Sequence, residues 1–336
     1  MHYPKIYIIV LNWNGRNDSL ACIESVRHID YPNFEVVVVD NGSIDDSVQA
    51  IKEVFPEVAL LETGENLGFA GGNNVGMRHA LKNGADYILL LNNDTIVDSH
   101  ILSSFMEASA LIGQEGIFGA KIYYYSEPNK IWYAGARWVD KIQHFLHVGQ
   151  GCVDNNGDFS SMAETDYACG CALLVKTDLL KEIGLFDERF FLTFEETDLC
   201  YRAKRAGYKS YFVPEARVWH KVSTSFGGEG SVLFNYFLMR NRLLWAEKNL
   251  PFGKRLVLYK DVFYELLRYI LPPRFRLNKS GENSSLKGIY SSLVDYKKSF
   301  VKKFNNPVRK ARFRAVRDYF LRRFGDCPES VRSPGK

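Results

Sequence analysis

A group of carboxylates in the second half of the chain could supply a catalytic base. Glu195, Glu196 and Asp198 follow an aromatic run at residues 190–194. Adjacent carboxylates and rings that exclude water raise the pKa of a carboxyl group, which can then accept a proton from a hydroxyl near neutral pH. The same acids could instead form a first helical turn that complements the helix dipole. That interpretation leaves the aromatic run unexplained.

Asp94 has the setting of a metal ligand. It follows Asn92 and Asn93 directly after the apolar run 87–91. A carboxylate there can bind Mg²⁺ or Mn²⁺, whose other ligands would be diphosphate oxygens and water. Turns and helix caps use the same residue types, so a structural role competes. His220 is a weaker candidate, because a lone histidine more often has a structural role than a metal-binding one.

Residues 65–76 form a glycine-rich segment that leads into a helix. Backbone N–H groups at such an entry can bind phosphate or ribose. The segment matches neither the dinucleotide-binding nor the Walker fingerprint. Close packing of a helix on a sheet explains the glycines equally well.

These residues need a scaffold, and the first hundred residues predict one. Strand-like runs at residues 6–11, 35–39, 58–61 and 87–91 alternate with helical patterns at 18–28, 45–54 and 70–83. The strands are continuously apolar, which indicates burial on both faces and therefore a parallel α/β sheet. Ligands bind at the carboxyl ends of such strands. Polar residues follow three of these ends, namely Asn12 and Asn14, Asp40, and Asn92 to Asp94.

Beyond this sheet, the charge distribution divides the chain. Residues 251–336 hold 21 of the 43 Lys and Arg but only 7 of the 39 Asp and Glu, which gives them a net charge of +14 against −10 for residues 1–250. Aromatic residues interleave with the basic ones at 297–304 and 309–314. This pattern suits a helix on an anionic membrane surface. Nucleic acid and a merely solvated helical face are the alternatives.

The compartment is predicted from what the chain lacks. Six cysteines without CxxC pairs favour a reducing environment. No export signal and no apolar stretch long enough to cross a bilayer is evident. We therefore expect a cytoplasmic protein that is not integral to a membrane.

Taken in order, these segments resemble glycosyltransferase family 2, and especially its rhamnosyltransferase-like bacterial members. The likeness covers about residues 5–245. It implies a GT-A fold with a mostly parallel central sheet over residues 1–250, with a nucleotide-binding part at about 1–115 and an acceptor-side part at about 116–250. A basic helical region follows at 251–336. The matching residues are 8–14, 38–45, 66–73, 91–95, 184–199 and His220.

The resemblance also implies residue roles. Asn12, Asn14 and Asp40 would contact the nucleoside, and Asn66, Gly68, Asn73 and Asn93 would line the nucleotide side. Asp94 occupies the last position of the family's DXD motif, in which Asn92 replaces the first acid, and His220 would complete the metal or diphosphate site. Glu196 stands where the family usually has an aspartate base, which leaves Glu195 and Asp198 as rivals.

The implied function is metal-dependent, inverting transfer of a sugar. The donor would be a nucleotide-diphosphate sugar, with dTDP-rhamnose favoured over a UDP-sugar, and the cofactor Mg²⁺ or Mn²⁺. The acceptor would be a hydroxyl of a glycan or lipid-linked precursor of a cell-surface polysaccharide. Peripheral association with the inner face of the plasma membrane, and no binding of nucleic acid, would follow. The alternative is a catalytically silent sugar-nucleotide or glycan-binding scaffold.

Overall fold

The structure is a computed structural model that describes residues 3–113, 116–141, 144–155, 157–222, 230–270 and 305–332. The chain forms two compact units, Met1–Ser225 and Phe226–Lys336. In these described ranges, no helix combines the length and apolarity that crossing a bilayer requires. The basic run at residues 297–304 lies outside the described residues.

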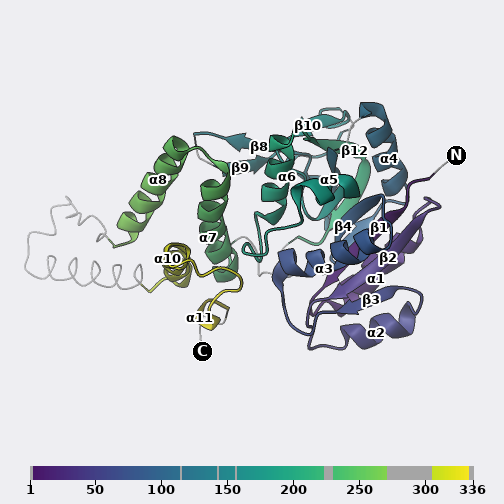
Figure 1. Cartoon of the computed structure of the whole chain (residues 1–336), viewed down its shortest axis with the longest axis horizontal. Helices are drawn as coiled ribbons and strands as arrows, with labels where there is room; N and C mark the ends of the chain where they lie inside the picture. Colours follow the sequence, from purple (N-terminus) through teal and green to yellow (C-terminus); the bar gives the residue numbers. More distant parts are fainter. Residues whose placement is uncertain are drawn as a thin grey trace, which may run out of the picture. The chain divides into compact units, whose positions relative to one another are not determined.

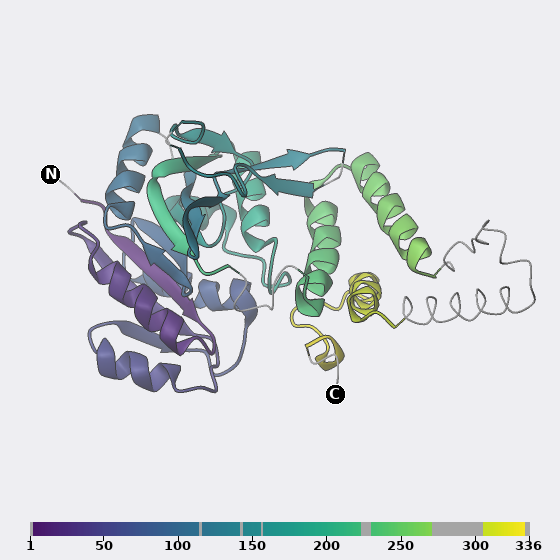
Figure 2. The same ribbon diagram turned by 180° about the vertical axis from the view of Figure 1, so that it is seen from behind.

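The first unit is built on four parallel strands, as predicted. The order along the sheet is β4-β1-β2-β3, and the strands are β1 (Ile6–Asn12), β2 (Phe34–Asp40), β3 (Ala59–Glu62) and β4 (Tyr87–Asn92). Helices α1 (Arg16–Arg27) and α2 (Ser47–Val54) pack against each other on one face, seen in Figure 2. Helix α3 (Gly68–Lys82) covers the other face, seen in Figure 1. The apolar runs of β1, β2 and β4 are buried, which explains their lack of alternation.

The sheet continues with strands of mixed direction. Antiparallel β11 (Ala172–Lys176) joins β4 to β6 (Gly116–Tyr124), and β12 (Lys209–His220) runs parallel to β6. The remaining partners are β5 (Thr95–Val97) and β10 (Ala163–Thr165) on β12, and β7 (Glu127–Tyr133) on β6. A separate hairpin pairs β8 (Ala136–Val139) with β9 (His144–His147). The helices of this part are α4 (Ile101–Ile112), α5 (Thr177–Ile183) and α6 (Glu195–Arg205).

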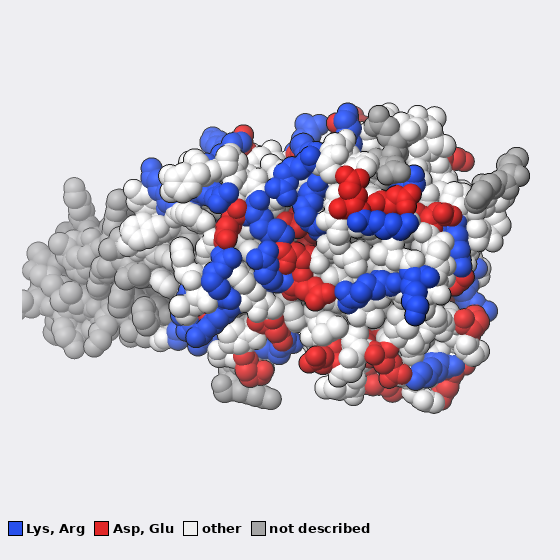
Figure 3. All heavy atoms as spheres, in the orientation of Figure 1, with Lys and Arg blue, Asp and Glu red and all other residues white. Residues whose placement is uncertain are grey.

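The second unit is helical, as predicted for the basic region. It comprises α7 (Val232–Asn249), α8 (Phe252–Ile270), α10 (Pro307–Phe320) and α11 (Glu329–Arg332). The Ser231 hydroxyl caps α7 by accepting from the Phe234 N–H at 3.1 Å, and Asn306 caps α10 by accepting from the Arg309 N–H at 3.0 Å. In space-filling view, much of the surface over α8 carries no charge and is bordered by Lys and Arg (Figure 3).

Helix α7 belongs to this second unit, so the compact units divide at 225/226 rather than at the predicted 250/251. The reason is burial, since α7 packs against α8, α10 and α11. Its Arg240 is fully buried, lies against the rings of Tyr236 and Phe237, and donates to the Gly325 carbonyl at 2.7 Å. The Tyr236 hydroxyl donates to Asp318 at 2.9 Å. The charge boundary at residue 250 therefore does not coincide with a packing boundary.

Candidate active site

The ends of β1 and β2 meet through a buried hydrogen bond. Their register pairs Asn12 with Asp40, and the Asn12 amide donates to Asp40 Oδ1 at 2.7 Å and to Ser43 Oγ at 3.0 Å. The side-chain oxygen of Asn12, Oδ1, accepts from the Ser19 hydroxyl at 2.7 Å and from the Asn93 amide at 3.4 Å. Asn12 is fully buried, so in this structure it orients Asp40 and Asn93.

Asn14 lies at the rim of the same region. It is exposed and adopts a left-handed conformation, with φ of 50°. Its backbone N–H donates to Ser43 Oγ at 2.9 Å, and its side-chain oxygen accepts from the Ile44 N–H at 2.8 Å. The loop after β1 is thereby fixed to the loop after β2. A molecule at this edge would meet Asn14 before it met Asn12.

The glycine-rich segment is held by Asn41, which the sequence analysis did not single out. The buried Asn41 amide donates to Asn66 Oδ1 at 3.1 Å and to the Gly68 carbonyl at 3.0 Å, and its oxygen accepts from the Leu67 N–H at 3.0 Å. Asn66 Oδ1 also accepts from the Gly68 N–H at 2.8 Å. Asn73 lies further along α3 and donates to the Phe69 carbonyl at 2.9 Å.

Gly68 is required here because the chain before α6 approaches it closely. Its φ is +72°, and a Cβ at this position would overlap the carbonyl oxygen of Phe191. The Ala70 N–H donates to that same carbonyl at 3.2 Å. The start of α3 is thus joined to the segment that leads into the carboxylates of α6.

Asp94 and His220 come together through strand pairing. β5 pairs with β12 so that Thr95 lies opposite His220. This places His220 Nε2 3.1 Å from Asp94 Oδ1, with both side chains 8% exposed. Lys221 donates its backbone N–H to the Asp94 carbonyl at 2.9 Å. Strand pairing therefore brings together two side chains that are 126 positions apart in the sequence.

These residues fit a divalent cation that takes most of its ligands from a substrate. Asn92 Oδ1, close to Asp94 in sequence, is buried and accepts no hydrogen bond from the described residues. The same ranges contain no cluster of three or more His, Cys, Asp or Glu with metal-binding geometry. A carboxylate oxygen, an amide oxygen and an imidazole are hard or intermediate donors, and Mg²⁺ and Mn²⁺ commonly use a few such ligands beside diphosphate and water.

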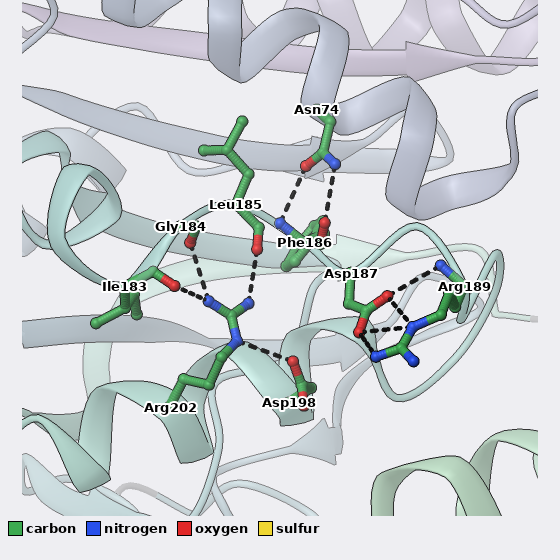
Figure 4. A network of polar contacts seen from close by, with 9 residues as sticks. All are labelled: Asn74, Ile183, Gly184, Leu185, Phe186, Asp187, Arg189, Asp198 and Arg202. Atoms are coloured by element: carbon green, nitrogen blue, oxygen red, sulfur yellow. Dashed lines mark hydrogen bonds and ion pairs between the residues drawn. The ribbon is translucent and has the colours of Figure 1, made fainter. Parts of the chain in front are cut away.

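The three carboxylates of α6 have different environments. Asp198 is fully buried and accepts from Arg202 Nε at 2.9 Å. The Arg202 guanidinium also donates to the carbonyls of Ile183, Gly184 and Leu185 (Figure 4). Asp198 therefore helps to anchor α6 to the end of α5. The Asp-x-x-x-Arg spacing on one helix face was the sequence signal for this pair.

Glu195 and Glu196 have raised pKa values. Burial, and then the charge of Glu196, raises the pKa of Glu195 well above its ordinary value. Burial likewise raises the pKa of Glu196, partly offset by backbone N–H groups that include those of Thr197 and Gly170. One buried oxygen of each carboxyl group, Oε2, has no hydrogen-bond partner among the described residues. The residue Glu195 is 3% exposed whereas Glu196 is half-buried, so Glu196 is the more accessible of the two residues.

The chain is strained immediately before these glutamates. Phe191, Thr193 and Phe194 have φ values of 63°, 69° and 72°. Each left-handed non-glycine residue costs on the order of 1 kcal/mol or more, and such residues concentrate at functional sites. Phe194 is the residue that precedes the first turn of α6. The strained backbone therefore sets the direction in which Glu195 and Glu196 project.

An aromatic and histidine wall, formed by Trp132, His147 and Tyr167, connects the two acidic regions. The Trp132 ring packs edge-on against His220 at 5.1 Å and against His147 at 4.8 Å between ring centres. His147 Nε2 lies 2.7 Å from the Tyr167 hydroxyl. Burial, then the charges of Cys169 and Glu196, raises the pKa of Tyr167. The wall thus extends from His220, beside Asp94, to Tyr167, three residues before Gly170, whose backbone N–H lies at the Glu196 carboxyl group.

This wall is neutral and carries unpaired polar atoms. Burial lowers the pKa of His147 to about 4, so its imidazole is uncharged at neutral pH. Trp132 Nε1, in the wall, and His220 Nδ1, beside it, are buried without a hydrogen-bond partner in the part of the chain that the structure describes. Such atoms are rare in folded proteins and call for an explanation. Sequence reasoning missed Trp132 and His147, because isolated aromatic residues in short strands give no distinctive signal.

Sequence comparisons relate the chain to known proteins. A sequence model of Glycosyl transferase family 2 matches residues 7–184. An N-acetylglucosaminyl-diphospho-decaprenol L-rhamnosyltransferase of Mycobacterium tuberculosis is 27% identical over 57% of this chain and 68% of its own length. The dTDP-rhamnosyl transferase RfbF of Shigella flexneri is 25% identical over 73% of this chain and 81% of its own length.

A solved structure supports the fold. The mannosyltransferase PcManGT from Pyrobaculum calidifontis, in complex with GDP-Man and Mn²⁺, superposes with a TM-score of 0.55 at 15% identity. The match covers 96% of this chain and 88% of that one. The predicted GT-A fold is confirmed.

Proposed function

The chain belongs to glycosyl transferase family 2, and from that premise we propose that it transfers a sugar from a nucleotide-diphosphate donor to an acceptor hydroxyl with inversion. The observation that carries this proposal is the pair of acidic regions joined by the Trp132, His147 and Tyr167 wall. One region, Asp94 with His220, suits a cation and a diphosphate. The other, Glu196, suits a proton acceptor. A sugar between them would meet both groups that the reaction needs.

Glu196 is the proposed base. Burial raises the pKa of Glu196. A carboxylate with a raised pKa is a stronger base, so it accepts the proton of an attacking hydroxyl more readily. Asp198 is less suited, because its charge is held by Arg202. Glu195 is less suited, because its side chain is almost completely enclosed. The acceptor hydroxyl, deprotonated by Glu196, would attack the anomeric carbon from the side opposite the leaving group, and this displacement inverts that centre.

The nucleotide would bind along the ends of β1, β2 and β4. Asn14 is exposed there, and Asp40, oriented by Asn12, would accept from the base or ribose. Asn66, Gly68, Asn73 and Asn93 would shape the same side. Asp94, with His220 beside it, would hold a divalent cation that neutralises the charge developing on the departing nucleoside diphosphate.

The neutral wall would recognise the sugar rather than the diphosphate. An uncharged imidazole and an indole N–H suit hydroxyl groups, whereas a diphosphate needs cations. We assign the unpaired Trp132 Nε1 to a sugar hydroxyl. The names of both relatives favour rhamnose as the transferred sugar. The Shigella flexneri relative is named for dTDP-rhamnose, which favours dTDP as the carrier. The Mycobacterium tuberculosis relative is named for a lipid-linked acceptor. We accordingly propose dTDP-rhamnose as donor, a UDP-sugar as the alternative, and cell-surface polysaccharide synthesis as the role.

The proposed place of action is the inner face of the plasma membrane, with residues 1–250 responsible for catalysis and residues 251–336 for placement. A lipid-linked acceptor would require this location, and the charge of +14 after residue 250 supports it.

The first test needs no acceptor. Purified protein would be screened by thermal shift against dTDP-, UDP- and GDP-sugars with Mn²⁺ or Mg²⁺, and the stabilising donor assayed for release of nucleoside diphosphate. We expect one donor to raise the melting temperature in a metal-dependent manner and to be hydrolysed slowly. Stabilisation without release or transfer would indicate the silent scaffold. No response to any donor would refute the nucleotide-sugar proposal itself.

A further inference from the structure

We propose that one face of α8, together with the end of α10, is the surface that docks onto an anionic bilayer. This inference deepens the proposed function, since it names the side chains that would hold the protein at the membrane. It rests on residues 252–267 of α8 and on residues 320–323, whose side chains the structure describes.

Helix α8 exposes large apolar side chains along one side. The opposite side is packed, with Leu258 fully buried and Val262 4% exposed. At 3.6 residues per turn, the exposed apolar residues occupy a sector separate from these two. A soluble helix normally directs polar residues outward, so apolar side chains here call for a partner. The exposed residues and fractions are Phe252 69%, Leu256 50%, Val257 50%, Phe263 58% and Tyr264 53%.

The end of α10 extends the same apolar surface. Phe320 is 64% exposed and Leu321 54%. The ring of Phe320 lies 6.4 Å from that of Tyr259, which is on α8 between Leu256 and Phe263. The Tyr259 and Tyr319 hydroxyls are 2.8 Å apart and hold the two helices together. Residues from two helices therefore form one patch, which we call the α8–α10 face.

Cations border the α8–α10 face. Lys260 is exposed between the apolar residues, with Nζ 5.7 Å from the centre of the Tyr264 ring, and Arg323 is exposed just after Leu321. Lys254 is not counted among these cations, because it lies on the side of α8 that also carries Asp261. Figure 3 shows uncharged surface over α8 next to Lys and Arg side chains. Apolar side chains flanked by Lys and Arg are the pattern of a helix that lies in the headgroup region of a membrane.

The charge selects the bilayer over a second copy of the chain. A symmetric dimer through the α8–α10 face would bring this basic region against itself, because the same patch meets on both subunits. Lys260 and Arg323 border the face on each copy, so that contact would bring like charges together. An anionic leaflet instead attracts each Lys or Arg near its surface, and its acyl chains can accept the aromatic and leucine side chains.

The test is vesicle flotation of the full chain and its point variants. Wild-type protein should float with phosphatidylglycerol-containing vesicles and much less with pure phosphatidylcholine. The double substitution Leu256→Asn and Phe263→Asn should lower the partition coefficient about tenfold or more, because it removes apolar area that enters the interface. Lys260→Gln should lower it about fivefold, on anionic vesicles only.

Matched controls lie in the first unit. Leu111 and Val54 are 81% and 52% exposed on α4 and α2, so Leu111→Asn with Val54→Asn removes a comparable number of exposed apolar side chains. Lys82→Gln matches the charge change. Both controls should float like the wild type. Nucleoside diphosphate release in solution should be unchanged in every variant, so loss of flotation with retained release separates this inference from the proposed function.

Two results would overturn the inference. Equal flotation of wild type and the Leu256→Asn, Phe263→Asn variant would show that the α8–α10 face is not the docking surface. A wild-type dimer in light scattering that becomes monomeric in this variant, without vesicle binding, would assign the face to self-association. Circular dichroism and melting temperature of the variant would be recorded alongside, and a folded variant that no longer floats supports the inference.

Discussion

Replacing Glu196 with glutamine tests the proposed base with the smallest change that the side chain allows. Glutamine keeps the shape of the glutamate but cannot accept the acceptor proton. General-base catalysis contributes about 10²–10⁴-fold to a rate, which is roughly 3–5 kcal/mol of barrier. We therefore expect kcat for transfer to fall by about 10²–10⁴, with little change in the dissociation constant of the donor.

The effect of this substitution on stability should go the other way. Burial raises the pKa of Glu196 in the folded protein above its unfolded value. Between the two pKa values the carboxyl group is ionised in the unfolded chain but still protonated in the folded protein. The free energy of unfolding therefore falls as the pH rises from the unfolded pKa to the folded pKa. Glutamine removes that penalty. The variant should melt at the same or a higher temperature at pH 7 to 8, while transfer is nearly lost.

The assay would follow sugar transfer over a pH series, with donor affinity and melting temperature measured on the same preparations. The acid limb of kcat/KM in the wild type should lie above the ordinary glutamate value of 4.5, because the pKa of Glu196 is raised. Glu195→Gln is the matched control and should retain far more activity. Full activity in Glu196→Gln, or a reversed order of the two variants, would refute the reasoning.

Three other substitutions probe the remaining groups. Asp94→Asn should weaken metal-dependent donor binding at least about tenfold, measured by Mn²⁺ titration in a thermal-shift assay; unchanged metal dependence would remove Asp94 from the site. Asp198→Ala should leave the Arg202 guanidinium without its carboxylate and cost about 3–5 kcal/mol, or roughly 6–20 °C in melting temperature; a stable but inactive variant would instead make Asp198 catalytic. Trp132→Phe removes an indole N–H that has no partner among the described residues, together with part of the ring that packs against His147 and His220. Stability should therefore fall by about 0.5–3 kcal/mol, while KM for one sugar rises roughly 2–10-fold. Donor hydrolysis and transfer kinetics would tell which sugar, and unchanged values for both would make Trp132 purely structural.

The scaffold of the site could be predicted from local patterns. The continuous apolar runs of β1, β2 and β4 identified a parallel sheet, and the polar residues after them had to meet at one edge. The structure agrees, with Asn12 bonded to Asp40 and Asn93. Local reasoning succeeded here because burial on both faces and strand direction fix the positions of strand ends.

Long-range pairing set the limit of sequence reasoning. The contact of His220 with Asp94 depends on β12 pairing with β5, and no spacing rule specifies that register. Trp132 and His147 join the site only because β7 pairs with β6 and the β8–β9 hairpin folds beside it. The ion pair of Asp198 with Arg202 did not depend on long-range pairing. Their spacing of four residues predicts contact on one helix face, but the neighbouring acids favoured a catalytic interpretation of Asp198.

The burial of Arg240 in α7 has a practical consequence for any shortened form of the protein. Ending the chain near residue 250, where the charge changes, would remove the Gly325 carbonyl that the Arg240 guanidinium binds, and Asp318, which the Tyr236 hydroxyl binds. The remaining α7 would expose the apolar surface that α10 and α11 now cover. A nonsense mutation or a deletion in this region should therefore produce an aggregation-prone polypeptide. Its loss of activity in cells would report proteolysis and clearance rather than a missing membrane anchor.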